Sequence, residues 1–309
     1  MMNTKIILFL LLTLLVSCST SVKREKILKN EAVPYGHIER LFLPSKHVPT
    51  RAVDIWFPDN YPSLGKYNVL YMHDGGALFG LEAPSFLTDG EWMMDEKISN
   101  LMTEGKIEPT IVVGIHNIGQ ERAIEYFPQE AISDIDVSLL VGGHLDSLAQ
   151  KGRADNYLRF IVEELKPYID SELEVNTSKE STYIMGSSMG ALISMYAICE
   201  YPDLFNGAGC LSTHWVGQME QNDEIPNAII KYMASSLPSS TDHKMYFSTG
   251  NQGLDSLYPI HQQKVDSLME DKGFKESKDY KSEYFKGEDH KVSSWVKNLN
   301  SPVLFLMGK

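Results

Sequence analysis

The segment GSSMG at residues 186–190 places Ser188 between two glycines. Apolar residues 183–185 precede it, and small and apolar residues at helical spacing follow it. The segment fits the G-x-S-x-G pattern, in which a strained strand-to-helix turn displays a serine hydroxyl at the end of a sheet. Glycines flank such a turn because side chains there would collide with the strand. The pentapeptide alone leaves open a plain loop whose serines cap a helix.

A serine hydroxyl is a weak nucleophile at neutral pH and needs a base that a third group orients. On folds that carry G-x-S-x-G, the acid and then the histidine follow the serine along the chain. Asp255, in STGNQGLDSLY, lies just beyond one predicted strand, and His290, in FKGEDHKVSSW, lies just beyond the last one. We predict that His290 accepts the proton of Ser188 and that Asp255 orients the imidazole.

Three other acidic residues compete for the third position. Asp242 precedes its predicted strand, which puts it at the opposite end of the sheet. Asp266 falls inside a predicted helix, and Asp289 directly adjoins the histidine in sequence. These placements favour Asp255.

A developing oxyanion needs two hydrogen-bond donors, and losing one typically costs about 10²- to 10³-fold in turnover. The N–H of Met189, the residue after the serine, is one candidate. The other comes from the loop after the predicted strand at 68–72, which reads HDGG at 73–76. We choose Gly76 as this second donor, with a simple turn as the alternative role of the loop.

Buried strands alternate with amphipathic helices along the chain. This order predicts an α/β fold, with a mostly parallel central sheet covered by helices on both faces. We expect one domain over residues 36–309. Strands are predicted at 38–43, 51–57, 68–72, 109–115, 182–185, 206–211, 244–247 and 280–285, and helices near 91–103, 157–169, 189–199, 228–235 and 259–272.

The N-terminus resembles a bacterial lipoprotein signal. Lys5 precedes an apolar run at 6–16, which is too short to span a bilayer, and Leu15-Val16-Ser17-Cys18 resembles the lipidation box. We expect residues 1–17 to be a signal peptide, Cys18 to carry the lipid and residues 18–35 to be a tether. The protein would then be anchored in the bacterial cell envelope. The alternative is an ordinary secretory signal with an incidental cysteine.

The composition and charge of the chain limit which partners and cofactors the protein can be expected to bind. The 309 residues carry a net charge of −13 with acidic residues scattered along the chain, so we expect no nucleic-acid partner. No HExxH or Cys/His spacing predicts a metal. Cys199 and Cys210 are expected to be buried free thiols, and the sequence leaves the oligomeric state open.

With these residues in view, the chain resembles the esterase D-like superfamily of α/β-hydrolases, which includes feruloyl and acetyl-xylan esterases of the first carbohydrate esterase family and enterochelin esterases. The resemblance runs over roughly residues 39–307. Two positions depart from many relatives: Ala191 stands where they have a second glycine, and Gly250-Asn251 where they have Gly-Thr. The matching segments are YMHDGGALF, GIHNIGQERAIEYFP with its R-x-x-E-Y-x-P pattern, YLRFIVEELKPYID, GSSMGA, TGNQGLDSLY and GEDHKVSSW.

The resemblance implies a serine carboxylic-ester hydrolase that needs no metal or organic cofactor. A small-molecule or oligosaccharide ester is the expected substrate, with feruloyl or acetyl groups on carbohydrate as the leading class. Three alternatives remain open at this stage: a siderophore esterase of the enterochelin type, an acyltransferase, and a non-catalytic envelope binding protein.

Several residues near the ends of predicted strands are candidates for substrate contacts. His214 and Trp215 follow the strand at 206–211, and an exposed Trp there could stack on a sugar or an aromatic acyl group. His116 and Asn117 end the strand at 109–115. Arg122 is expected to fix a loop by pairing with Glu125.

Overall fold

The computed structural model describes residues 22–27, 33–81, 89–136, 153–240 and 242–309. The predicted signal peptide and Cys18 therefore lie outside the described residues. Within them, the strands form one nine-stranded sheet in the order β1-β2-β3-β5-β4-β6-β7-β8-β9. The strands are β1 (Lys23–Ile27), β2 (His37–Phe42), β3 (Ala52–Phe57), β4 (Asn68–His73), β5 (Thr110–Ile115), β6 (Thr182–Ser187), β7 (Gly207–Leu211), β8 (Lys244–Thr249) and β9 (Tyr280–Tyr284).

The sheet is antiparallel at one end and parallel from β5 onward. The parallel strands bring their carboxyl ends to one edge, and every residue of β4, β5 and β6 is buried. Burial on both faces explains why these strands read as continuous apolar runs and do not alternate with polar residues.

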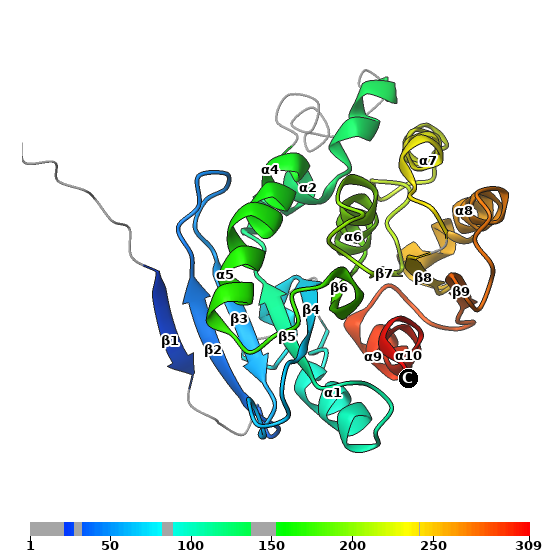
Figure 1. Ribbon diagram of the computed structural model, residues 1–309. Coiled ribbons are helices and arrows are strands. Elements are labelled where there is room, and N and C mark those ends of the chain that lie inside the picture. Colours follow the sequence, from blue (N-terminus) through cyan, green and yellow to red (C-terminus); the bar gives the residue numbers. More distant parts are fainter. Residues whose placement is uncertain (1–21, 28–32, 82–88, 137–152, 241) are drawn as a thin grey trace, which may run out of the picture.

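Helices cover both faces of the sheet (Figure 1). On one side lie α4, α5, α6, α7 and α8, and on the other lie α1, α9 and α10, each side with its own apolar cluster. The helices are α1 (Met94–Thr103), α2 (Arg122–Tyr126), α4 (Ala154–Arg159), α5 (Lys166–Glu172), α6 (Met189–Glu200), α7 (Glu224–Ser236), α8 (Pro259–Asp271), α9 (Val292–Asn298) and α10 (Asn300–Met307), with a π-helical turn at Phe160–Leu165 that joins α4 to α5.

The predicted α/β fold is confirmed, and each predicted strand lies within two residues of an observed one. Three expectations need correction. Part of the predicted tether forms β1, which pairs with β2, and Val33 is buried. The helix predicted at 157–169 extends over 154–172. The helices α9 and α10 were not predicted, because short apolar runs do not distinguish a helix from a strand.

Among the described residues, no helix is both long and apolar enough to cross a bilayer. Cys199 and Cys210 are buried and free, as expected. Burial raises the pKa of the Cys199 thiol to about 12, which leaves little thiolate at neutral pH.

A buried polar group lies beneath the end of β4. Arg51 donates two hydrogen bonds of 2.7 Å to Glu125, and the side chains of this pair are 1% and 0% exposed. The Arg51 guanidinium also lies 5.2 Å from the ring centroid of Tyr157, whose hydroxyl is 2.7 Å from Nδ1 of His73. Burial lowers the pKa of His73 to about 3, so its imidazole is neutral in the folded protein near neutral pH.

We expect Glu125→Gln to destabilise the protein by about 3–5 kcal/mol, because the guanidinium of Arg51 would stay buried without a countercharge. Urea unfolding measures this loss. Glu121→Gln is the matched control: Glu121 pairs with Arg153 at 38% side-chain exposure, so its loss should cost less than about 1 kcal/mol. Equal losses in the two variants would contradict the buried pair's role.

Acid should destabilise the fold partly through His73. Between pH about 6.5 and 3, the unfolded chain binds a proton at this imidazole that the folded chain excludes, so stability falls as the pH falls. We expect His73→Gln to show a smaller drop in Tm between pH 7 and pH 5 than the wild type. His37→Gln, whose ring is 27% exposed, is the control. An unchanged drop in His73→Gln would refute this contribution.

Candidate active site

Ser188 lies on a strained turn between β6 and α6. Its φ angle is +59°, a conformation that residues other than glycine rarely adopt. A Cβ atom on Gly186 would lie 2.7 Å from backbone atoms of Gly190, so only glycine fits there. The Ser188 N–H donates to the carbonyl of Leu211 on β7, which ties the turn to the sheet.

The structure brings Ser188, His290 and Asp255 into one hydrogen-bonded chain. Nε2 of His290 lies 2.9 Å from Oγ of Ser188, and Nδ1 of His290 lies 2.6 Å from Oδ1 of Asp255. A carboxylate can only accept, so Nδ1 must donate to it. The lone pair of Nε2 therefore faces the serine hydroxyl, which is the arrangement that a general base requires.

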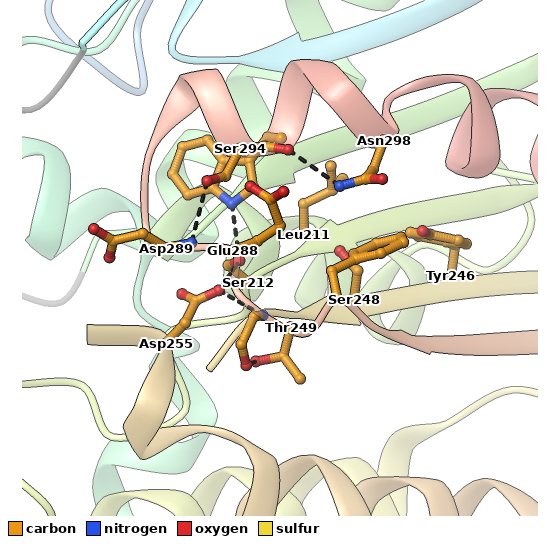
Figure 2. A pocket seen from close by; sticks show the side chains of 13 residues that line it. Leu211, Ser212, Tyr246, Ser248, Thr249, Asp255, Glu288, Asp289, Ser294 and Asn298 are labelled. Atoms are coloured by element: carbon orange, nitrogen blue, oxygen red, sulfur yellow. Dashed lines mark hydrogen bonds between the residues drawn. The ribbon is translucent and has the colours of Figure 1, made fainter. Parts of the chain in front are cut away.

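Asp255 is held firmly on the turn Gly253–Leu257, which follows β8. It is 1% exposed. While Oδ1 faces His290, Oδ2 accepts hydrogen bonds from the N–H of Gly250 at 2.7 Å and from the hydroxyl of Ser212 at 2.6 Å (Figure 2). Three hydrogen bonds thus hold the carboxylate in one orientation.

The competing acids lie elsewhere. Asp242 pairs with Lys179 and is 60% exposed at its side chain. Asp266 accepts from Gln262 within α8. Asp289 accepts from the backbone N–H of His290 and pairs with Lys291, so it helps to shape the histidine loop but does not contact the imidazole nitrogens.

The departure at Asn251 has a structural explanation. Its Oδ1 accepts a hydrogen bond of 2.7 Å from the N–H of Gly287, and its own N–H donates to the carbonyl of Glu288. Asn251 therefore fastens the loop that carries Asp255 to the loop that carries His290. The presence of Asn251 in place of threonine therefore does not change which carboxylate faces His290, namely that of Asp255.

The HDGG loop packs against the start of α6. Asp74 has φ +59°, and a Cβ on Gly190 would lie 3.4 Å from its Oδ2. Arg122 donates two hydrogen bonds of 2.7 Å to Asp74, and Asn117 adds one of 2.8 Å. Burial alone would raise the pKa of Asp74, but the Arg122 guanidinium overcomes this effect and lowers the pKa below its ordinary value.

Two of the four predicted substrate contacts serve the protein itself. His116 Nε2 lies 2.8 Å from Asp54, and both polar ends of Asn117 are used, by Asp74 and by the N–H of Gly119. Asn117 was predicted to contact the substrate, whereas Asp74, to which it donates, was not singled out from the sequence. A polar residue before two glycines at a strand end was the available signal.

Two expectations were wrong. Trp215 is 0% exposed and donates to Gln262, so its ring packs inside the protein and is not available for stacking on a substrate. Arg122 does have a structural role, but its partner is Asp74, while Glu125 pairs with Arg51.

His214 borders the hydrogen-bonded chain. Its ring centroid lies 6.4 Å from that of His290, and its Nδ1 lies 2.6 Å from the hydroxyl of Tyr258. Burial lowers the pKa of His214 to about 3, so the ring is neutral at physiological pH.

Within the described ranges, no group of three or more His, Cys, Asp or Glu side chains is arranged to hold a metal ion.

Known proteins share this architecture. The chain is 27% identical over 165 residues to the ferri-bacillibactin esterase BesA of Bacillus subtilis. The matched region covers 51% of this chain and 52% of that protein. An IroE-like serine hydrolase from Shewanella oneidensis superposes with a TM-score of 0.63 at 19% identity, covering 87% of this chain and 79% of the other.

The ferulic acid esterase AmCE1/Fae1A of Anaeromyces mucronatus superposes with a TM-score of 0.59 at 17% identity, covering 90% of this chain and 92% of the other. At these identities the solved structures establish the fold. The family model described as "Putative esterase" matches residues 49–306, which is most of the chain. The chain therefore belongs to this esterase family.

Proposed function

We propose that this protein is a serine carboxylic-ester hydrolase in which Ser188 is the nucleophile, His290 the general base and acid, and Asp255 the group that orients the imidazole. The observation that carries this proposal is the unbroken chain of short contacts, 2.9 Å from Ser188 to His290 and 2.6 Å from His290 to Asp255. Membership of the esterase family supports the same chemistry.

In the first half of the reaction, Oγ of Ser188 attacks the ester carbonyl while its proton moves to Nε2 of His290. The resulting tetrahedral oxyanion collapses, and the alcohol leaves with the proton from His290. In the second half, His290 takes a proton from water as the water attacks the acyl-enzyme. The second tetrahedral intermediate then collapses, His290 returns the proton to Oγ of Ser188, and the acid is released.

The N–H groups of Met189 and Gly76 are the proposed donors to the oxyanion. Met189 is the first residue of α6, so its N–H has no acceptor within the helix. Gly76 lies on the Gly75–Ala77 turn that follows Asp74, and the Arg122 pair holds this turn against the first turn of α6.

The proposed substrates are feruloyl or acetyl esters of carbohydrates. Similarity to a ferulic acid esterase supports this class, and similarity to the bacillibactin esterase supports siderophore esters as the second candidate. Two cations among the described residues near the catalytic residues, Arg122 and Lys291, favour the uncharged carbohydrate esters. Arg122 is neutralised by Asp74 and Lys291 by Asp289, so neither offers an uncompensated charge to an anionic catecholate.

We expect Ser188→Ala to lower kcat/KM for p-nitrophenyl acetate by about 10⁴-fold or more, because the nucleophile is lost while binding contacts remain. Ser187→Ala, one residue earlier on β6, is the matched control and should keep the hydrolysis within about tenfold of wild type. Release of nitrophenol at equal rates from wild type and Ser188→Ala would overturn the proposed nucleophile.

Substrate class is decided by comparing methyl ferulate, an acetylated xylo-oligosaccharide and enterobactin under the same conditions. Faster Ser188-dependent cleavage of enterobactin would replace the carbohydrate proposal with the siderophore one. Acyl transfer to an added sugar alcohol in preference to water would identify a transferase. Inertness toward all esters would favour a binding protein.

We also propose that Cys18 is lipidated and anchors the protein in the cell envelope, on the strength of the sequence Leu15-Val16-Ser17-Cys18. Cys18→Ala should move the protein from the membrane fraction to the soluble fraction and abolish incorporation of a labelled fatty acid. Cys199→Ala is the control, because this thiol is buried in the folded domain. Retention of the Cys18→Ala protein in the membrane fraction would contradict anchoring through a lipid on Cys18.

A further inference from the structure

Ser212 occupies an unusual position directly after β7. Its φ angle is +45°, although it is not a glycine, and its side chain is buried. Its N–H donates to the carbonyl of Ser248 at 2.8 Å, which continues the pairing of β7 with β8. Strained backbone at a buried serine persists only where the surrounding structure enforces it, and such positions cluster at functional sites.

The hydroxyl of Ser212 has two partners of opposite kind. Nε1 of Trp295 lies 2.8 Å from Oγ, and Oγ lies 2.6 Å from Oδ2 of Asp255. An indole N–H can only donate, so it occupies a lone pair of the hydroxyl. The hydroxyl proton must then point at Asp255, and Trp295 thereby fixes the direction in which Ser212 donates. Figure 2 shows the Ser212 and Asp255 side chains joined by a dashed line.

Trp295 also contacts the other end of the same site. Its ring meets the His290 ring edge-on, at a centroid distance of 5.1 Å and an interplanar angle of 86°. The Trp295 ring also stacks on Trp92, with a centroid distance of 5.5 Å and an interplanar angle of 17°. One side chain on α9 therefore packs against the base directly and reaches the acid through Ser212.

We propose that Ser212 and Trp295 are positioning residues that extend the hydrogen-bonded chain to five members, Trp295–Ser212–Asp255–His290–Ser188. Ser212 holds Oδ2 of Asp255 so that Oδ1 faces Nδ1 of His290, and Trp295 holds Ser212. This inference rests on the proposed esterase function. It adds that catalysis depends on an N–H and a hydroxyl that do not touch the substrate.

The test measures Ser188 in two ways, by the rate of covalent labelling with a fluorophosphonate and by p-nitrophenyl acetate hydrolysis. Ser212→Gly should slow both by about 10- to 100-fold, the loss expected for a hydrogen bond to a charged group. The fall should lie in kcat, with KM unchanged. The Tm should fall only modestly, because the backbone strain that glycine relieves at a positive φ offsets part of the cost of the two lost hydrogen bonds.

Trp295→Phe keeps the ring on Trp92 and His290 but removes the N–H, and it should slow both rates by a smaller factor. Trp92→Phe is the matched control, since it alters the same stack without breaking the chain, and its rates should equal those of the wild type. The double variant Ser212→Gly/Trp295→Phe should be no slower than Ser212→Gly alone, because the indole acts through the hydroxyl.

Wild-type rates in Ser212→Gly would overturn the proposal, and multiplied losses in the double variant would overturn the action of Trp295 through Ser212. If Ser212→Gly does not fold, the Trp295→Phe variant alone tests the proposal. Wild-type labelling and hydrolysis rates in Trp295→Phe would then refute the positioning role. If the wild-type protein neither labels nor hydrolyses, the proposed function falls and the positioning role falls with it. An active wild type with unaffected variants refutes only the positioning role.

Discussion

The hydrogen bond between Asp255 and Nδ1 of His290 determines which imidazole nitrogen faces Ser188. The two loops that carry these residues follow β8 and β9, which are adjacent and parallel, so both emerge at the same edge of the sheet. Asn251 then fastens one loop to the other. Because the carboxylate is buried and anchored through Oδ2, the imidazole has a fixed partner, and the geometry at the serine follows from it.

The opposite side of the site depends on the short helix α2. Its first residue, Arg122, holds Asp74 in the glycine loop, and the Tyr126 hydroxyl accepts from the N–H of Asp74. Glu125 on the same helix pairs with the buried Arg51. The R-x-x-E-Y pattern thus connects the loop that would bind the oxyanion to the core, which explains why charged residues occupy so protected a place.

Family membership and fold agree with the residue geometry but do not select the substrate. The proteins to which the chain is similar include a ferulic acid esterase and a ferri-bacillibactin esterase, so the likeness is compatible with very different esters. Substrate choice is made by loops around the parallel sheet edge. Among the described residues, Arg122 is paired with Asp74 and Lys291 with Asp289, and this pairing is the physical basis for proposing a neutral ester.

Local sequence determined the serine turn, the buried strands and the order of serine, acid and histidine, because glycine requirements and apolar runs act over a few residues. It could not determine which charges pair, that Trp215 is buried, or that α9 brings Trp295 to Ser212 across 83 positions of sequence. Those outcomes depend on contacts between distant segments. Only the folded sheet sets which side chains are close enough to compete for one partner, so tertiary structure alone decided them.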